Sequence, residues 1–152
     1  MPPDRIDWFF KHPPLVFMFF GALAALSSYV SAMVSGWSAL SKRFQFTGQF
    51  HGQSWPLRIA RMRFFARYWL TVGADESGLY LSVFSLFRIA HPPLLISWSE
   101  VTVMPGYIDL IFKKRELRLG RQESIPLRIS ASLFERLRSS AGGAWPQESV
   151  MA

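Results

Sequence analysis

The chain has 152 residues, half of them hydrophobic and 16% aromatic, with a formal net charge of +7 and no cysteine. This length suits one small domain with one additional element. Because cysteine is absent, disulfide scaffolds, thiolate zinc sites and cysteine nucleophiles are excluded. The hydrophobic residues are unevenly distributed, since no charged residue occurs from His12 to Ser41.

Residues 15–34 form an uninterrupted run of uncharged, mainly apolar residues. As a helix rising about 1.5 Å per residue, this run is roughly 30 Å long, which matches the hydrocarbon thickness of a bilayer. Pro13 and Pro14 precede it, and proline is tolerated in the first turn of a helix because the donors there have no helical partner. We therefore predict a transmembrane helix over residues 15–36.

Residues typical of the membrane–water interface flank this run. An interfacial tail is predicted over residues 1–14, where a histidine follows several aromatic residues. That histidine suits simple interfacial placement, and contact with a headgroup, a partner backbone or a pigment metal are the alternatives. The predicted interfacial anchors are Trp8, His12 and Trp37.

A cleaved signal peptide is the main alternative to a membrane anchor. Two acidic residues offset the two basic residues before the run, the run is longer than a typical signal core, and Ser31-Ala32 is a weak cleavage site. A core helix of a soluble domain is disfavoured because the rest of the chain reads mainly as short strands. From Lys42 to Arg67 there are six basic residues and no acidic one. The positive-inside rule therefore places the C-terminal part in the cytoplasm, with the helix in the inner membrane.

Small residues recur at intervals of about four along the predicted helix, which makes one of its faces smooth. Such a face lets a second helix approach closely, although small residues are also common in membrane helices by chance. We predict that this face docks on other integral membrane subunits. Its residues are Gly21, Ala24, Ala25, Ser28, Ala32 and Gly36.

Residues 37–54 are predicted to connect the membrane helix to a domain. Trp37, Leu40 and Phe44 follow a helical spacing with basic residues on the other side, which indicates a short amphipathic helix lying along the headgroups. Residues 47–55 contain two glycines and no charge, which is typical of a loop.

Residues 55–141 are predicted to form an α+β domain of about seven antiparallel strands followed by a helix. Short apolar and β-branched runs alternate with turn residues, and Leu133, Phe134 and Leu137 then follow a helical spacing behind a capping serine, Ser130 or Ser132. The predicted tail is residues 142–152. The predicted strands lie at 58–65, 68–72, 79–84, 94–98, 101–103, 108–112, 117–119 and 125–129, with turns at 73–78, 105–106, 113–114 and 120–121.

This order of strands and a final helix resembles the pleckstrin-homology-like fold over residues 55–140, which implies a β-barrel closed by the C-terminal helix. A more specific resemblance lies in GLYLSVFSLFRIAHPPLLISWSEV at 78–101 and GWSAL at 36–40. These segments resemble an uncharacterised family of small bacterial membrane-anchored proteins with a GLYLS, LFR, HPPL and Trp pattern. Ser97 departs from that pattern, which has proline before the tryptophan. The resemblance implies an architecture and no activity.

No catalytic or metal-binding motif is present. The three histidines fall on different predicted elements, no Walker A, GxGxxG or GxSxG pattern occurs, and the acidic residues are scattered. We therefore predict a protein that is not an enzyme and has no cofactor. His91, in a repeated His-Pro-Pro tripeptide, is interpreted as a polar cap on a rigid loop.

Basic residues form two sets, one after the membrane helix and one near 113–121. Near an anionic leaflet each such charge contributes about 1 kcal/mol, so we predict contact with anionic lipids or an acidic partner. A solvated positive surface is the plain alternative, and nucleic acid is disfavoured because no recognition helix is evident. The predicted contact residues are Lys42, Arg43, Arg58, Arg61, Arg63, Arg67, Lys113, Lys114 and Arg115.

Together these patterns predict a non-catalytic single-span protein that acts as an accessory or assembly subunit of a larger membrane complex, of respiratory, photosynthetic or transport type. The alternative is a peripheral adaptor that recognises anionic lipid headgroups through its basic strands.

Overall fold

The computed structural model describes residues 11–63, 66–109 and 111–148. It begins with a long helix, α2 (Pro13–Ser35), followed after Gly36 by a short helix, α3 (Trp37–Phe44). Gly36 ends α2 with a φ of 84°, a left-handed conformation that glycine adopts without strain. A Cβ at this position would lie 2.4 Å from Cδ1 of Ile125, so the turn between the two helices is also tightly packed against the sheet.

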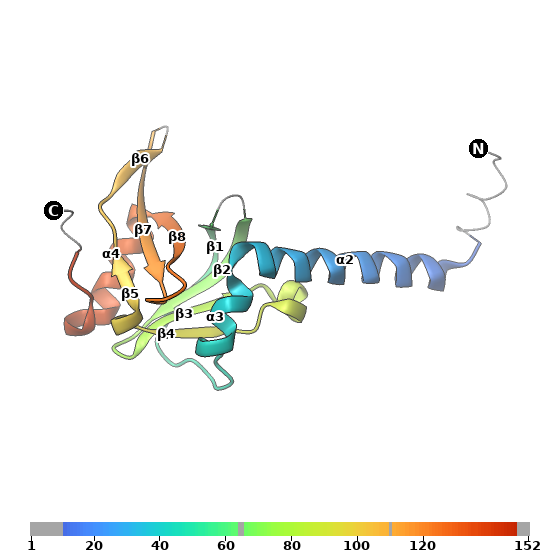
Figure 1. The fold of residues 1–152 in the computed structure, drawn as a ribbon, viewed down its shortest axis with the longest axis horizontal. Coiled ribbons are helices and arrows are strands. Elements are labelled where there is room, and N and C mark those ends of the chain that lie inside the picture. Colours follow the sequence, from blue (N-terminus) through green and yellow to red (C-terminus); the bar gives the residue numbers. More distant parts are fainter. Residues whose placement is uncertain (1–10, 64–65, 110, 149–152) are drawn as a thin grey trace.

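The helix α2 is long and apolar enough to cross a membrane, and it is the one such helix among the described residues. Only 11% of its most apolar window is buried, which sets it apart from the core helix of a soluble protein. Figure 1 shows α2 leaving the domain and extending well beyond it toward its N-terminal end. The N-terminal tail up to residue 10, including the predicted anchor Trp8, lies outside the described residues.

Eight antiparallel strands form one sheet in the order β4-β3-β2-β1-β8-β7-β5, with β6 also paired to β7. The α+β class predicted from the sequence is confirmed. The strands are β1 (Gln53–Met62), β2 (Ala66–Ala74), β3 (Gly78–Val83), β4 (Leu94–Ser97), β5 (Val101–Val103), β6 (Tyr107–Asp109), β7 (Phe112–Leu119) and β8 (Ile125–Ser130).

The sheet is open, so the predicted closed barrel is not shown. Among the described residues no strand ladder joins β4 to β5, which are the two ends of the sheet order. Each of these edges instead carries a single bridge to another segment, Gln45 on Leu94 of β4 and Glu148 on Val103 of β5. The edges that a barrel would have to join are therefore partly covered by the chain itself.

Close packing of β3 against β4 explains why Gly78, the first residue of the GLYLS segment, is a glycine. It starts β3 opposite Ser97 of β4. A Cβ at Gly78 would lie 2.3 Å from the backbone oxygen of Ile96, so any side chain here would push the two strands apart.

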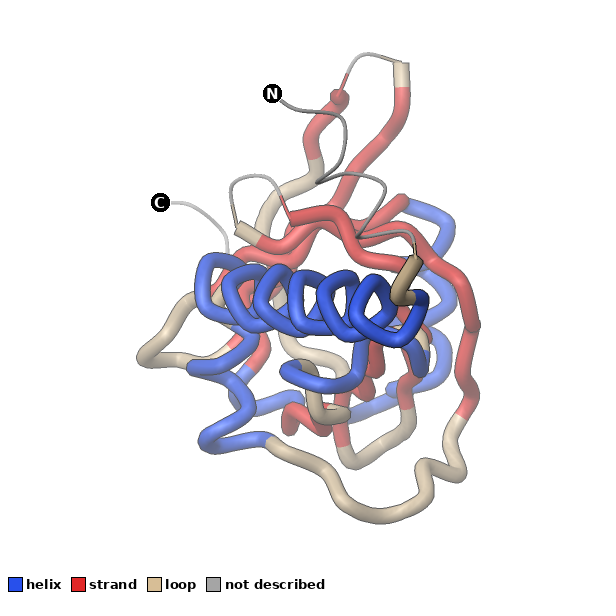
Figure 2. Tube along the Cα trace, turned by 90° about the vertical axis from the view of Figure 1, so that its right-hand side faces the viewer, coloured by secondary structure: helices blue, strands red, loops and turns tan. Residues whose placement is uncertain are grey.

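One predicted turn was wrong. Lys113 and Lys114 are not a turn but lie inside β7, paired with Ile108 and Tyr107 of β6. Asp109 of β6 pairs with Phe112 of β7, so the two strands form a hairpin that reverses before Lys113. Figures 1 and 2 both show this hairpin standing out from the domain, to the side of α2 rather than along it.

The C-terminal helix α4 (Ala131–Ala141) follows the prediction closely. The side chain of Ser130 accepts a hydrogen bond from the Leu133 amide at 3.3 Å, as an N-cap does. Leu133, Phe134 and Leu137 are buried in the core. The described part of the predicted tail, residues 142–148, packs on the domain, because the Trp145 ring lies 5.1 Å from the rings of both Trp98 and Phe134.

The short helix α3 forms as predicted, but its apolar face lies in the domain core and not along the membrane headgroups. Its apolar residues Trp37 and Leu40 are completely buried in the domain core. An interfacial anchor must reach the headgroups, so Trp37 is not one. The apolar face of α3 packs on the sheet instead of on a membrane because Gly36 turns the chain back against Ile125.

Candidate functional site

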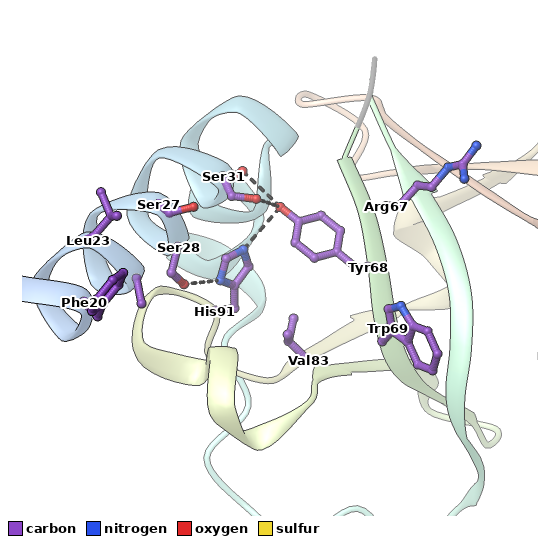
Figure 3. Close-up of a pocket in the computed structure, with 11 residues that line it drawn as sticks. Phe20, Leu23, Ser27, Ser28, Ser31, Arg67, Tyr68, Trp69, Val83 and His91 are labelled. Atoms are coloured by element: carbon purple, nitrogen blue, oxygen red, sulfur yellow. Dashed lines mark hydrogen bonds between the residues drawn. The ribbon is translucent and has the colours of Figure 1, made fainter. Parts of the chain in front are cut away.

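A chain of hydrogen bonds joins α2 to the domain at its C-terminal end (Figure 3). The Ser28 hydroxyl lies 3.3 Å from Nδ1 of His91, and Nε2 of His91 lies 3.3 Å from the Tyr68 hydroxyl. Tyr68 in turn contacts Ser31 of α2 through both the hydroxyl, at 2.7 Å, and the backbone oxygen, at 3.0 Å. Two turns of α2 are thus bound to the strand β2 and to the loop after the short helix η1 (Ser85–Ala90).

The proton positions in this chain follow from the backbone oxygen of Ser31, which can only accept. The Tyr68 hydroxyl therefore donates to it. Nε2 of His91 then donates to the Tyr68 oxygen, and Nδ1 forms the other hydrogen bond with the Ser28 hydroxyl. Every group in the chain has a complementary partner in this arrangement, which is what a buried polar cluster requires.

Aromatic packing reinforces the junction. The Trp37 ring lies 5.4 Å from the His91 ring and 6.0 Å from the Tyr68 ring, and its Nε1 donates to the backbone oxygen of Pro92 at 2.9 Å. His91 is only 1% exposed. The domain is therefore held directly against the end of α2 rather than attached through a flexible linker.

His91 is more than the loop cap that the sequence suggested, and Tyr68 was not singled out at all. The available signal was the group of serines inside an otherwise apolar run, because polar residues within a membrane helix usually have a partner. The partner itself was not readable, since Tyr68 and His91 are distant from these serines in the chain.

The predicted docking face of α2 is divided by this junction. Ser28 and Ala32 are 8% and 2% exposed, and Gly36 is buried, so these three residues contact the chain's own domain. They are not available to a second helix, which corrects the prediction for them. Gly21 and Ala24 remain exposed, and Ala25 is half-buried.

A pocket of about 570 Å³ lies between α2 and the sheet, directly beside the hydrogen-bonded chain. Its α2 side combines apolar side chains with serine hydroxyls. Arg67 and Trp69 border it from β2, and Figure 3 shows them on the other side of that strand from Tyr68. The lining residues are Phe20, Leu23, Ala24, Ser27, Ser28, Ser31, Arg67, Tyr68, Trp69, Val83 and His91.

The predicted basic contact residues do not form one surface. Arg43 forms ion pairs with Glu100 at 3.4 Å and Glu123 at 3.1 Å. Arg115 pairs with Glu148 and lies over the Phe134 ring. Arg43 and Arg115 are thus partnered within the chain, which argues against them as lipid contacts. Of the others, Lys42, Arg58, Arg63, Arg67 and Lys113 are exposed, and Arg61 and Lys114 are half-buried.

Two arginines face each other on the outer surface of the sheet. Arg61 of β1 lies directly opposite Arg67 of β2 and, on its other side, Arg128 of β8. Arg128 pairs with Glu116 at 3.0 Å, whereas Arg61 and Arg67 have no carboxylate partner among the described residues. The Nε of Arg61 is buried and lacks a hydrogen-bond partner in that part of the chain. Facing like charges and a buried donor without an acceptor both oppose folding, the second by about 1–3 kcal/mol.

The end of the β6–β7 hairpin is apolar and uncovered. Ile108, Ile111 and Phe112 are 69%, 84% and 61% exposed. Lys113 and Lys114 follow Phe112 in β7, so positively charged residues lie next to the apolar end of the hairpin. Because Ile108 pairs with Lys113 and Asp109 pairs with Phe112, the Ile108 and Phe112 side chains lie on opposite faces of the hairpin. Large apolar side chains exposed at a projecting end are suited to contact with a protein or a membrane.

The predicted interfacial residue His12 directly precedes α2 and is exposed. Within the described residues no group of three or more His, Asp or Glu side chains is positioned to hold a metal ion.

Comparison of the chain with protein-family models, with curated proteins and with solved structures gives no match. The resemblance to the membrane-anchored family therefore stays a prediction.

The hydroxyl at the centre of the junction provides a direct test. Replacing Tyr68 with phenylalanine leaves the ring in place but removes the partner of His91 and of the Ser31 oxygen, so we expect the free energy of unfolding to fall by about 1–3 kcal/mol. Thermal unfolding of the full chain in detergent measures this. Tyr80→Phe, on a partly exposed ring stacked on Phe50 at 4.6 Å, is the matched control and should unfold like the unmodified protein. Equal midpoints for both variants would contradict the hydrogen-bonded junction.

Proposed function

We propose that the protein is a single-span, non-catalytic membrane protein that serves as an accessory or assembly subunit of a larger membrane complex. In this proposal α2 crosses the inner membrane and the domain lies on the cytoplasmic side, as the basic residues after α2 favour. The domain is proposed to be pleckstrin-homology-like, which is supported by the pairing of the first strand with the last and by the helix that follows the last strand.

The exposed end of the β6–β7 hairpin is the observation that carries this proposal. A hairpin that projects to the side of α2 extends along the membrane surface when α2 crosses the bilayer, toward a neighbouring protein rather than into the lipid below. Burying its three exposed side chains would stabilise a complex, because each buried large apolar side chain contributes about 1.5–3 kcal/mol. The exposed part of the smooth α2 face, at Gly21 and Ala24, offers a second contact within the bilayer.

The hydrogen-bonded junction between α2 and the domain supports the same role. A subunit that recognises its partner through both a membrane helix and a domain gains from holding the two in one geometry, since less conformational freedom is lost on binding. The adaptor alternative is less well supported as the main function, because Arg43 and Arg115 already bind carboxylates of the same chain.

Retention of α2 in the mature protein is the first expectation. Cleavage after Ala32 would remove Ser28 and Ser31 and leave the buried His91 and Tyr68 without these partners. We therefore expect the full chain to stay in the membrane pellet after carbonate extraction and to keep its own N-terminus on sequencing. A soluble mature chain that starts near Met33 would contradict the anchor.

Docking through the hairpin is tested by purifying the tagged full chain in mild detergent from its native membranes. With Ile108, Ile111 and Phe112 all replaced by serine, we expect co-purification of integral membrane subunits to fall by about tenfold or more, because the apolar contact is lost. The matched control is Leu57→Ser, the same kind of change at a residue of β1 that is 55% exposed. Equal recovery of the partner by the triple variant would refute docking through the hairpin, and the absence of any reproducible integral partner would refute the accessory role.

A further inference from the structure

The outer surface of β1 and β2 carries a second, independent feature. We propose that Arg61 and Arg67 bind the phosphate of an anionic phospholipid at the membrane surface. This inference does not depend on the hairpin, but it rests on the proposal that α2 crosses the membrane.

The level of these arginines along the membrane follows from the junction. Ser31 lies about 24 Å along α2 from Leu15, where the apolar run begins, at a rise of about 1.5 Å per residue. The hydrocarbon layer is about 30 Å thick, so Ser31 lies near its far boundary when α2 crosses. Tyr68 is hydrogen-bonded to Ser31, and Arg67 and Trp69 are its immediate neighbours in β2. Arg67 and Trp69 therefore lie close to the headgroups.

The same conclusion follows from the free length of α2. Ser28 is the first buried residue of α2, and the stretch from Pro13 to Ser27 is only about 22 Å long as a helix. This is shorter than the hydrocarbon layer, so α2 crosses only if its last turns and the domain segments packed on them enter the headgroup layer. The strand β2 is one of those segments.

The chemistry of the patch fits a phosphate. Arg61 and Arg67 face each other across the strands without a carboxylate between them, and the Nε of Arg61 is buried without an acceptor among the described residues. A phosphate between the two side chains supplies the missing negative charge and several acceptor oxygens, and guanidinium groups bind such oxygens in pairs.

The apolar neighbours favour a lipid over a soluble anion. Ile59 and Trp69 lie directly opposite each other beside the arginine pair, and they are 59% and 58% exposed. Tryptophan favours the headgroup region of a membrane.

The test compares two double variants that each remove two positive charges. Full-length protein is reconstituted in nanodiscs of phosphatidylcholine and phosphatidylglycerol, and the lipids retained by the protein are counted by native mass spectrometry. We expect the unmodified protein and Lys113→Gln/Lys114→Gln to retain phosphatidylglycerol selectively, and Arg61→Gln/Arg67→Gln to lose this selectivity by about tenfold or more. Equal selectivity in both double variants would overturn the proposal, since only overall charge would then matter.

Three further measurements distinguish a lipid site from a soluble-anion site, a folding defect and a failed membrane anchor. Inorganic phosphate at matched ionic strength should raise the unfolding midpoint in detergent much less than phosphatidylglycerol added to the micelles does, and the reverse order would assign the site to a soluble phosphate instead.

Arg61→Gln/Arg67→Gln should unfold no earlier than the unmodified protein in neutral detergent, because it removes a facing pair of like charges. If it unfolds earlier, the single variant Arg67→Gln takes its place, and unchanged selectivity in that variant would refute the site. Carbonate extraction of the same variants separates loss of lipid binding from failure of the membrane anchor.

Discussion

Replacing Trp37 with alanine is expected to lower the free energy of unfolding of the domain by about 3–5 kcal/mol, the cost typical of removing a large buried aromatic side chain. Trp37 is completely buried and packs on His91 and Tyr68, and its ring nitrogen bonds to the backbone oxygen of Pro92. Its loss opens a cavity at the point where α2 joins the domain. Thermal unfolding of the full chain in detergent measures the effect.

The control for Trp37 is Trp69→Ala, the same change at a ring that is 58% exposed on the outer surface of β2. We expect its unfolding midpoint to stay close to that of the unmodified protein, since little packing is lost. If Trp37 were an interfacial anchor, its replacement by alanine would leave the unfolding midpoint of the domain nearly unchanged. A Trp37→Ala protein with an unchanged unfolding midpoint would therefore restore the anchor interpretation and contradict the packing described above.

Replacing Phe134 with alanine should have an effect of similar size, about 3–5 kcal/mol. Phe134 is completely buried where α4 meets the sheet, with the Arg115 guanidinium 4.1 Å above its ring and Trp145 at 5.1 Å. The substitution removes the central contact of α4, the ring beneath the Arg115 guanidinium and one of the two rings on which Trp145 packs. Chemical unfolding followed by tryptophan fluorescence checks this, because Trp145 reports on the same cluster.

Arg136→Ala, on the exposed side of α4, is the matched control for Phe134. It keeps the helix propensity and removes no buried contact, so its effect should stay within about 0.5 kcal/mol. If both α4 variants unfold alike, the helix does not contribute to the core in the way its buried face indicates.

The part of the site that lies on α2 shows where sequence reasoning reached its limit. The predicted smooth face was read as a surface for another protein, yet Ser28 and Ala32 are covered by the chain's own domain. Small residues permit close approach without specifying what approaches. The partner residues His91 and Tyr68 come from separate parts of the chain, and only their pairing in space joins Ser28, Ser31 and a His-Pro-Pro loop into one junction.

The basic residues give a second example. All nine, in two sets along the chain, were predicted as contacts for anionic lipid or an acidic partner because the sequence shows charge and spacing. The structure separates them by register and by ion pairing: Arg43 and Arg115 hold carboxylates of the same chain, whereas Arg61 and Arg67 face each other across two strands. Cross-strand register is fixed by the whole sheet, so this difference has no local signature.

Local periodicity and local chemistry in the sequence were enough to predict several features of the fold. The long apolar run became α2, the alternating runs became an antiparallel sheet, and Leu133, Phe134 and Leu137 specified which face α4 buries, while the cap was left open between Ser130 and Ser132. Only the tertiary structure decided where those elements meet. Trp37 is at the same spacing from its neighbours whether α3 lies on a membrane or on a sheet, so its periodicity is identical in both cases. The left-handed turn at Gly36 and the packing of Ile125 place the Trp37 ring in the core. Burial against the domain and contact with lipid both remove the apolar area of the ring from water, so no sequence pattern distinguishes the two.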